Sequence, residues 1–244
     1  MSIASTLVTD VTDKSAIIRF LMRNKPMNLY QLGDLDPFFF PKTKWFAAVR
    51  EDAIKEMAML YAGDRGRTLL AFADNDSSLL ASVIDASAEE MKGESFAHFS
   101  CGLAGELKRV RPVSYLGRHL KMTLNSGKLP DEPVREGTKR LGPDDRVKLL
   151  EFYEENYPGN YFDERMLSTG KYFGSFENNM LTGVAGIHVY SAEMRVAALG
   201  NIAVAKNLRG IGIGRNLVIC LCRDLLQTVD TVGLNVESTD QQAV

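Results

Sequence analysis

Apolar residues in the second half of the chain recur with periods that predict alternating helices and strands. Over residues 146–157 they recur every three to four positions, and the pattern stops at Pro158 and Gly159, which do not continue a helix. The dipeptide Asn178-Asn179 separates two short apolar stretches, as is typical of a hairpin turn. The predicted elements are helices at 146–157, 163–167 and 215–228 and strands at 172–176, 181–190, 196–204 and 231–236.

The first half also interleaves helices with strands, which predicts an α/β or α+β arrangement. Its first helical pattern begins at residue 14 and is broken by Gly33 and Pro37. The predicted elements are helices at 14–32 and 79–91 and strands at 46–49, 56–61, 68–72, 96–99 and 114–124.

Residues 126–133, SGKLPDEP, contain two prolines and a glycine between two apolar-periodic regions, which is typical of a connection between compact units. The chain length of 244 residues allows one large domain or two compact ones. We therefore predict an N-terminal α/β domain at 1–128 and a second domain at 135–244.

Composition excludes several classes of protein. The chain is 45% hydrophobic and 25% charged, as in ordinary globular proteins, and its formal charge of -2 lacks the basic excess of a nucleic-acid binder. No apolar stretch approaches the ~20 residues that span a bilayer, so no membrane partner is expected. The odd cysteine count, with Cys220 and Cys222 in one apolar run, favours a reducing compartment, and we expect a cytoplasmic protein. His98, His119 and His188 are far apart, and no metal site is predicted.

A glycine-rich turn is the segment that carries chemistry. Gly210, Gly212 and Gly214 lie between an apolar strand and a helix, where glycine lets the backbone turn tightly with its N–H groups aligned. The helix N-terminus adds unsatisfied donors and the positive end of its dipole, so the segment predicts an anion site. Arg209 and Arg215 flank the turn and can neutralise phosphate charge.

Glycine spacing argues against two nucleotide sites. A Rossmann fingerprint counted from Gly210 would put Arg215 at the third glycine, and a P-loop would need a Lys-Ser/Thr pair that is absent. The pattern that matches is R-x-x-G-x-G, formed by Arg209, Gly212 and Gly214. The alternative is that the glycines only close a tight turn, but three glycines in five residues with flanking arginines exceed that need.

The segment LGNIAVAKNLRGIGIG, residues 199–214, resembles the pyrophosphate loop of the GNAT superfamily of acyl-coenzyme A dependent N-acyltransferases, whose pattern is Q/R-x-x-G-x-G/A. The resemblance covers residues 135–244 and implies an α/β (α+β) fold with a mixed, mostly antiparallel sheet flanked by helices. NLYQLGDL and YLGRHLKMTL in the first half look like a degenerate GNAT-like half, similar to that of two-domain glycine N-acyltransferase-like proteins, although no glycine loop survives there.

This resemblance implies a site for acetyl-coenzyme A as co-substrate, without a metal. The pantetheine arm would lie along the strand before the loop, whose backbone N–H groups would polarise the thioester carbonyl. The implied coenzyme-binding residues are Ile202, Ala203, Val204, Arg209, Gly210, Ile211, Gly212, Ile213, Gly214 and Arg215.

Direct attack by an amine, which the resemblance also implies, requires a group that accepts the ammonium proton. The candidates are Glu237, at the end of the last strand, and Asn201, which could order a water. Glu237 could equally be a solvated charge, and Asn201 could simply satisfy a backbone group. The resemblance also implies a general acid. In the family, a Tyr that follows the fifth strand and the next helix commonly protonates the departing thiolate. The sequence stops at Val244, in what resembles the first turn of the next helix, so we expect a missing C-terminal tail or a sheet that closes differently.

The favoured function is therefore an N-acyltransferase that moves an acetyl group to a primary amine. The alternatives are a coenzyme A binding sensor or scaffold without catalysis and, third, a nucleotide-binding protein. A near-neutral charge balance favours a small amine or amino acid over a peptide or protein amine and argues against a nucleic-acid partner. We expect the first half to help shape the acceptor cleft.

Overall fold

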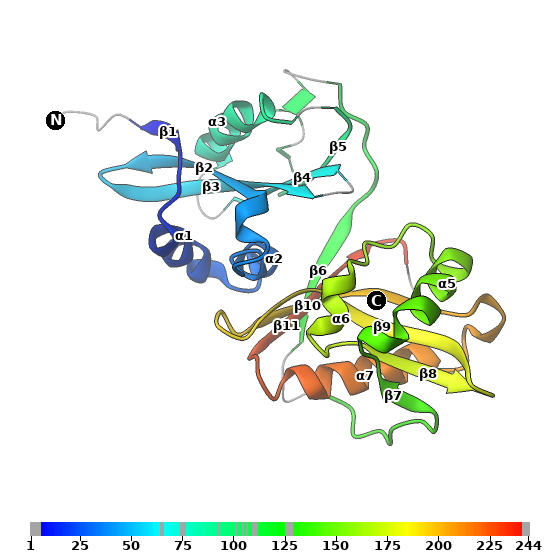
Figure 1. The fold of residues 1–244 in the computed structure, drawn as a ribbon. Coiled ribbons are helices and arrows are strands. Elements are labelled where there is room, and N and C mark those ends of the chain that lie inside the picture. The colour runs from blue at the N-terminus through cyan, green and yellow to red at the C-terminus, as the bar shows by residue number, and fades with distance from the viewer. Residues whose placement is uncertain are drawn as a thin grey trace. The chain divides into compact units, whose positions relative to one another are not determined.

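The computed structural model divides into two compact units, Met1–Gly117 and Arg118–Val244. Each unit has one β-sheet flanked by helices (Figure 1). None of the helices in the described part of the chain is long and apolar enough to cross a bilayer. The structure describes residues 6–63, 66–73, 77–91, 93–100, 102–103, 105, 107–108, 112–124 and 129–240.

Five strands form the sheet of the first unit. Its elements are β1 (Leu7–Asp10), α1 (Lys14–Leu21), η1 (Met22–Asn24), α2 (Leu29–Gly33), η2 (Phe40–Lys42), β2 (Thr43–Arg50), β3 (Ala53–Gly63), β4 (Gly66–Ala71), α3 (Ser77–Ala88) and β5 (Ser95–Phe99). The strands lie in the order β1-β2-β3-β4-β5. All neighbours pair antiparallel except β4 and β5, which are parallel and connected through α3.

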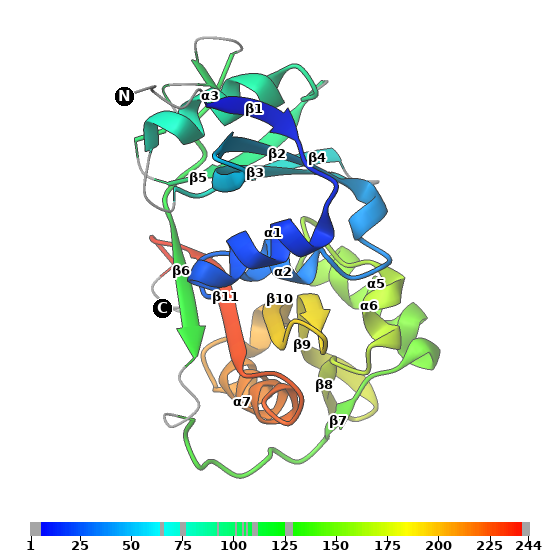
Figure 2. The same cartoon turned by 90° about the vertical axis from the view of Figure 1, so that its left-hand side faces the viewer.

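Six strands form the sheet of the second unit. Its elements are β6 (His119–Leu124), β7 (Thr138–Arg140), η4 (Pro143–Asp145), α5 (Arg146–Asn156), α6 (Glu164–Ser168), β8 (Phe173–Glu177), β9 (Met180–Ser191), β10 (Val196–Val204), η5 (Lys206–Leu208), α7 (Ile213–Leu225) and β11 (Thr231–Glu237). The strand order is β6-β11-β10-β9-β8-β7, and only β10 and β11 are parallel. Helices α5 and α6 cover one face of this sheet and α7 the other (Figures 1 and 2).

Both units repeat one plan. The first runs β1, α1, α2, β2, β3, β4, α3, β5, and the second runs β7, α5, α6, β8, β9, β10, α7, β11, with the same pairing directions. Strand β6 is an addition, paired with β11 at the edge of the second sheet. The predicted fold class is confirmed: a mixed, mostly antiparallel sheet flanked by helices, with a GNAT-like first half.

The hairpin prediction is confirmed in detail. β8 ends at Glu177 and β9 begins at Met180, so a loop of two residues joins them. Asn178 and Asn179 both have positive φ, 49° and 64°, as a type I′ turn requires.

The helix predicted at 14–32 is wrong in its middle, where the structure has η1 and a turn. Asn28 donates from Nδ2 to the carbonyl of Leu21 at 3.0 Å, and Asn24 accepts from the backbone N–H of Met27 at 3.3 Å. These short amides compete with the helical hydrogen bonds, and Pro26 has no N–H to donate.

The end of the first unit also differs from the prediction. The strand predicted at 114–124 is ordered as β6 only from His119, and its pairing with β11 places it in the second unit rather than in a domain ending at residue 128. Residues 125–128, in the predicted connection, lie outside the described residues. The short strands β1 and β7 were missed.

Candidate functional site

Strands β10 and β11 part in the middle of the second sheet. Their parallel register covers only the pairs from Val196↔Thr231 to Ala198↔Gly233. On its other side β10 remains paired with β9 as far as Val204. Beyond Ala198, the edge of β10 toward β11 therefore carries backbone groups outside the ladder, and residues 202–204 lie on this edge.

Asn201 forms a bulge where the strands part. From Gly200 to Ala203 the register of β10 gains one residue over β9, and Asn201 has a positive φ of 54°. The side chain is buried, with 2% exposure. Its Oδ1 accepts from the backbone N–H of Tyr161 at 3.0 Å, and its Nδ2 donates to the hydroxyl of Tyr172 at 2.9 Å. Both ends of the amide are thus hydrogen-bonded within the protein. This agrees with the alternative that Asn201 satisfies a backbone group rather than ordering a water.

Two buried tyrosines brace this bulge from the side of α5 and α6. The hydroxyl of Tyr153 donates to the carbonyl of Asn201 at 2.6 Å, and that of Tyr172 donates to the carbonyl of Ile187 at 3.0 Å. The ring of Phe162 packs between them, 5.7 Å from each centroid. Burial raises the pKa of both tyrosines, so the hydroxyls stay protonated and serve as donors.

The glycine loop follows β10 and opens directly into α7. Gly210 and Gly212 have φ of 80° and 87°, which L side chains rarely adopt, and a Cβ at either would meet no other atom within 4 Å. The first bond of α7 runs from the N–H of Asn216 to the carbonyl of Gly212 at 3.0 Å. The N–H groups of residues 213–215 precede it and have no partner within the helix. The loop therefore offers donors beside open space.

Both arginines predicted to flank the phosphates have partners within the protein. Arg209 donates to the carbonyls of Val204 at 3.2 Å and Asn156 at 3.4 Å. Arg215 pairs with Glu132, with Nη2 and Oε1 2.6 Å apart, and the hydrogen bond from Arg215 lowers the pKa of Glu132.

A third arginine, missed in the sequence, lies at the loop. Arg135 donates from Nη1 to the carbonyl of Ile211 at 3.2 Å, and its backbone N–H donates to Oδ1 of Asn216 at 2.9 Å. No local signal could have found it, because it precedes the motif by more than 70 residues and lies at the start of the predicted second domain.

Glu237 ends β11 on the exposed surface, four residues beyond the last residue paired with β10.

His188 lies on β9, with its ring 6.3 Å from that of Tyr161. A Cβ on Gly200 would collide with this ring, at 2.0 Å, so glycine is needed there. Desolvation of the half-buried imidazole lowers the pKa of His188 to about 4, which leaves it neutral at pH 7.

In the described part of the first unit, the parallel strand pair does not part as β10 and β11 do. Strands β4 and β5 stay paired from Arg67↔Ser95 to Ala71↔Phe99, and the sequence after β4, FADND, has no glycine and two acidic residues.

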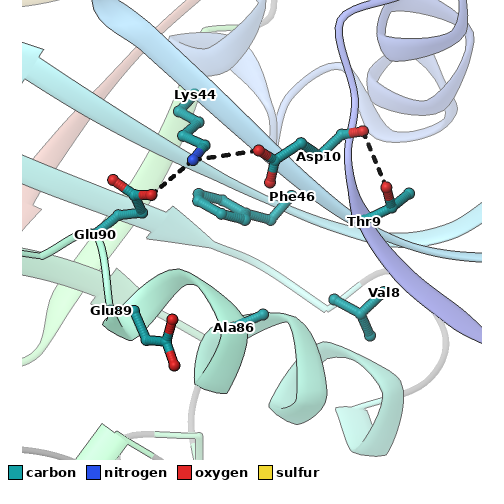
Figure 3. A pocket seen from close by; sticks show the side chains of 8 residues that line it. All are labelled: Val8, Thr9, Asp10, Lys44, Phe46, Ala86, Glu89 and Glu90. Carbon is teal, nitrogen blue, oxygen red and sulfur yellow. Dashed lines mark hydrogen bonds and ion pairs between the residues drawn. The ribbon is translucent and has the colours of Figure 1, made fainter.

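A hollow of about 190 Å³ lies in the first unit between β1, β2 and α3 (Figure 3). There Lys44 lies between the carboxylates of Asp10, at 3.2 Å, and Glu90, at 2.7 Å, which neutralise its charge and raise its pKa. Among the described residues, no group of three or more His, Cys, Asp or Glu could hold a metal ion.

Comparison with known proteins finds a family match in the part of the chain that contains the glycine loop. Residues 142–244 match the family model described as "Acetyltransferase (GNAT) family". No curated protein matches the sequence.

Solved structures resemble the chain across both units. A Drosophila protein aligns with a TM-score of 0.67 at 13% identity, over 98% of this chain and 92% of that one. A GCN5-related N-acetyltransferase from Sphaerobacter thermophilus aligns with 0.61 at 13% identity, over 96% and 88%. A tandem GNAT protein from the clavulanic acid biosynthesis pathway aligns with 0.53 at 12% identity, over 98% and 92%. At these identities the likeness shows the fold.

Proposed function

We propose that residues 142–244, a GNAT acetyltransferase domain, bind acetyl-coenzyme A and transfer its acetyl group to a primary amine. The observation that carries this proposal is the parting of β10 from β11 along the half of β10 that leads to the glycine loop. The parted edge can pair with an extended pantetheine arm as a further strand would. The loop at the end of the same strand can then accept the diphosphate.

The two halves of this site are close enough to act on one ligand. Asn201 and Val204 are three residues apart, about 10 Å in a strand, and the loop begins within a few residues of Val204. The rigid bulge at Asn201 fixes where the edge of β10 begins. A ligand with a thioester at one end and a diphosphate at the other would therefore lie along β10.

The reaction would proceed by direct attack. The amine nitrogen bonds to the thioester carbon, the carbon–sulfur bond breaks, and the coenzyme leaves as the thiolate while the nitrogen gives up a proton. Backbone N–H groups on the free edge of β10 can stabilise the oxyanion. Glu237 is the candidate proton acceptor, because it is exposed on the strand that parts from β10. Asn201 contributes by holding the bulge, since its amide is bonded within the protein.

Thiol release from acetyl-coenzyme A with a panel of amines tests the activity. We expect turnover with at least one amine, and we expect Glu237→Gln to lower the rate most at low pH, where amines are protonated. Turnover by Glu237→Gln equal to wild type at every pH would remove Glu237 from the mechanism.

Gly212→Glu tests the loop, with Gly212→Gln as matched control. Both variants carry the same backbone strain and nearly the same volume, and open space surrounds the position, so the fold should persist. Only Glu adds a negative charge beside the proposed diphosphate, so it should weaken coenzyme A binding by roughly tenfold more than Gln does. Equal affinity of the two folded variants, measured by calorimetry, would contradict the loop assignment.

The alternative function is a coenzyme A binding sensor or scaffold without catalysis. The observation that favours it is that the Asn201 amide is hydrogen-bonded within the protein. Of the two proton acceptors predicted from the sequence, only Glu237 then remains. Binding of acetyl-coenzyme A without thiol release across a broad panel would support this alternative.

For the acceptor we propose a small amine or an amino acid, with a peptide or protein amine as second choice. The charge of the second half, -4 from 12 basic and 16 acidic residues, is too small to select a strongly charged polymer. Values of kcat/KM for free amino acids and for lysine peptides would rank the two classes.

A further inference from the structure

The connection before β7 lies along α7 and reaches the glycine loop. Residues 129–136, here called the strap, run as a coil beneath α7 (Figure 2). Arg223, in the last turns of α7, donates to the carbonyls of Pro130 at 2.8 Å and Glu132 at 2.7 Å. Asn216, in the first turn, donates to the carbonyl of Pro133 at 2.8 Å. The strap is therefore fixed to α7 at both ends by bonds to its backbone.

This attachment brings strap side chains to the loop. A hollow of about 330 Å³ lies between strap residues 132–135 and the loop and helix residues Gly212 and Arg215. Arg135 reaches the loop from one side, through the carbonyl of Ile211. Arg215 lines the same hollow, but its charge is engaged by the carboxylate of Glu132, with a second contact from Nε at 3.1 Å.

We propose that the strap sets the affinity of this site for the coenzyme A diphosphate by an exchange of ion pairs. Glu132 holds Arg215 in the free protein, and the diphosphate takes Arg215 together with Arg135 when it binds. This inference rests on the proposed function. It adds a cation and a competing carboxylate that the loop motif does not contain.

Exposure and charge favour the exchange. The side chains of Arg215 and Glu132 are 65% and 36% exposed, and such pairs contribute little to stability, so the pair can open at small cost. A diphosphate offers guanidinium groups more negative charge and the same bidentate geometry. Removing the Glu132 charge should therefore tighten coenzyme A binding, and removing the Arg135 charge should weaken it.

Calorimetric binding of coenzyme A to the whole chain tests this proposal. Glu132→Gln should tighten binding roughly two- to fivefold, while Asp131→Asn, the same charge change on a fully exposed neighbour 3.7 Å from Arg223, should have less effect. Arg135→Gln should weaken binding roughly three- to tenfold. Arg195→Gln, at the far end of β10 and paired with Asp230, is its control and should change little. The backbone bonds that fix the strap remain in the Glu132 and Asp131 variants.

Two further arms identify the mechanism. In an Arg215→Gln background, Glu132→Gln should give no further gain, because Glu132 acts through Arg215. With pantetheine, which has no diphosphate, neither strap variant should change affinity. With dephospho-coenzyme A, which keeps the diphosphate and lacks the 3′-phosphate, both effects should persist.

The outcomes separate this proposal from the proposed function. No binding of coenzyme A by the wild type would overturn both. Wild-type binding with equal effects of Glu132→Gln and Asp131→Asn, or with no effect of Arg135→Gln, would overturn the role of the strap and leave the coenzyme site standing. Effects that vanish with dephospho-coenzyme A would overturn the assignment to the diphosphate.

Discussion

Asn201 shapes β10 through its backbone and its side chain, and the two contributions can be separated. Asn201→Ala keeps a Cβ at a positive φ of 54° and removes the amide. Asn201→Gly removes the amide as well but adopts this φ without strain. The difference between the two variants measures the cost of the bulge conformation.

The contacts of Asn201 give the expected magnitudes. Loss of Oδ1 leaves the partly buried N–H of Tyr161 without its acceptor, at about 1–2 kcal/mol, and loss of Nδ2 removes a bond to Tyr172 worth about 1 kcal/mol. Wild-type Asn201 already carries the strain of a non-glycine residue at this φ, about 1 kcal/mol, which Asn201→Ala keeps and Asn201→Gly relieves. We expect Asn201→Ala to destabilise the second unit by about 2–3 kcal/mol and Asn201→Gly by about 1–2 kcal/mol.

Urea unfolding with two probes assigns the loss to the correct unit. Trp45, the single tryptophan, is buried in the first unit and reports that unit by fluorescence. Cys220 and Cys222 are buried in α7, so labelling of their thiols reports opening of the second unit, in a background with Cys101→Ser. Only the thiol transition should shift. A loss below about 1 kcal/mol in Asn201→Ala, or equal losses in both variants, would refute this account of the bulge.

Two further predictions concern stability. Asp224→Asn removes the partner of buried Lys171, 2.8 Å away, and should cost about 2–3 kcal/mol. Burial raises the pKa of Asp224, but Arg140 and Lys171 beside it lower that pKa by more, to below the unfolded value. The stability that ionised Asp224 contributes is therefore present above about pH 4 and lost as the pH falls further. Unfolding curves at pH 6 and pH 3 should differ in wild type and much less in the variant. Gly186→Ala would place a Cβ 2.1 Å from the ring of Tyr172 and should destabilise by about 3 kcal/mol, whereas Gly159→Ala, with open space around it, should be near neutral in the same urea assay.

Features encoded by neighbouring residues could be predicted from the sequence. The alternation around Asn178-Asn179 specifies the β8–β9 hairpin locally, and R-x-x-G-x-G places the loop because all its members lie within six residues. The helix break after Leu21 was missed because it depends on which backbone groups the amides of Asn24 and Asn28 bond. β7 has only three residues, too few to show a period.

The parts of the site that could not be predicted depend on long-range contacts. Glu132 and Arg215 are 83 residues apart, and nothing in the composition of the connection marks it as a neighbour of the loop. The partners of Asn201 come from several segments that are distant in sequence, among them Tyr153, Tyr161 and Tyr172, so its structural role became visible only with the fold. The sequence therefore predicted the glycine loop between a strand and a helix, but it did not show that Glu132 pairs with Arg215.

The repeated plan of the two units leads to a last prediction, that each chain binds one molecule of coenzyme A. Both units place a parallel strand pair after three antiparallel strands, so the repeated plan offers two positions at which a site could form. In the second unit this pair stops after Ala198↔Gly233, whereas in the first it continues through five residue pairs and is followed by FADND, which would repel phosphate. Titration calorimetry should therefore give a stoichiometry near one, and Gly212→Glu should weaken that single site without revealing another. A stoichiometry of two, with one site weakened and the other unchanged in Gly212→Glu, would show that closed pairing in the first unit does not prevent binding there.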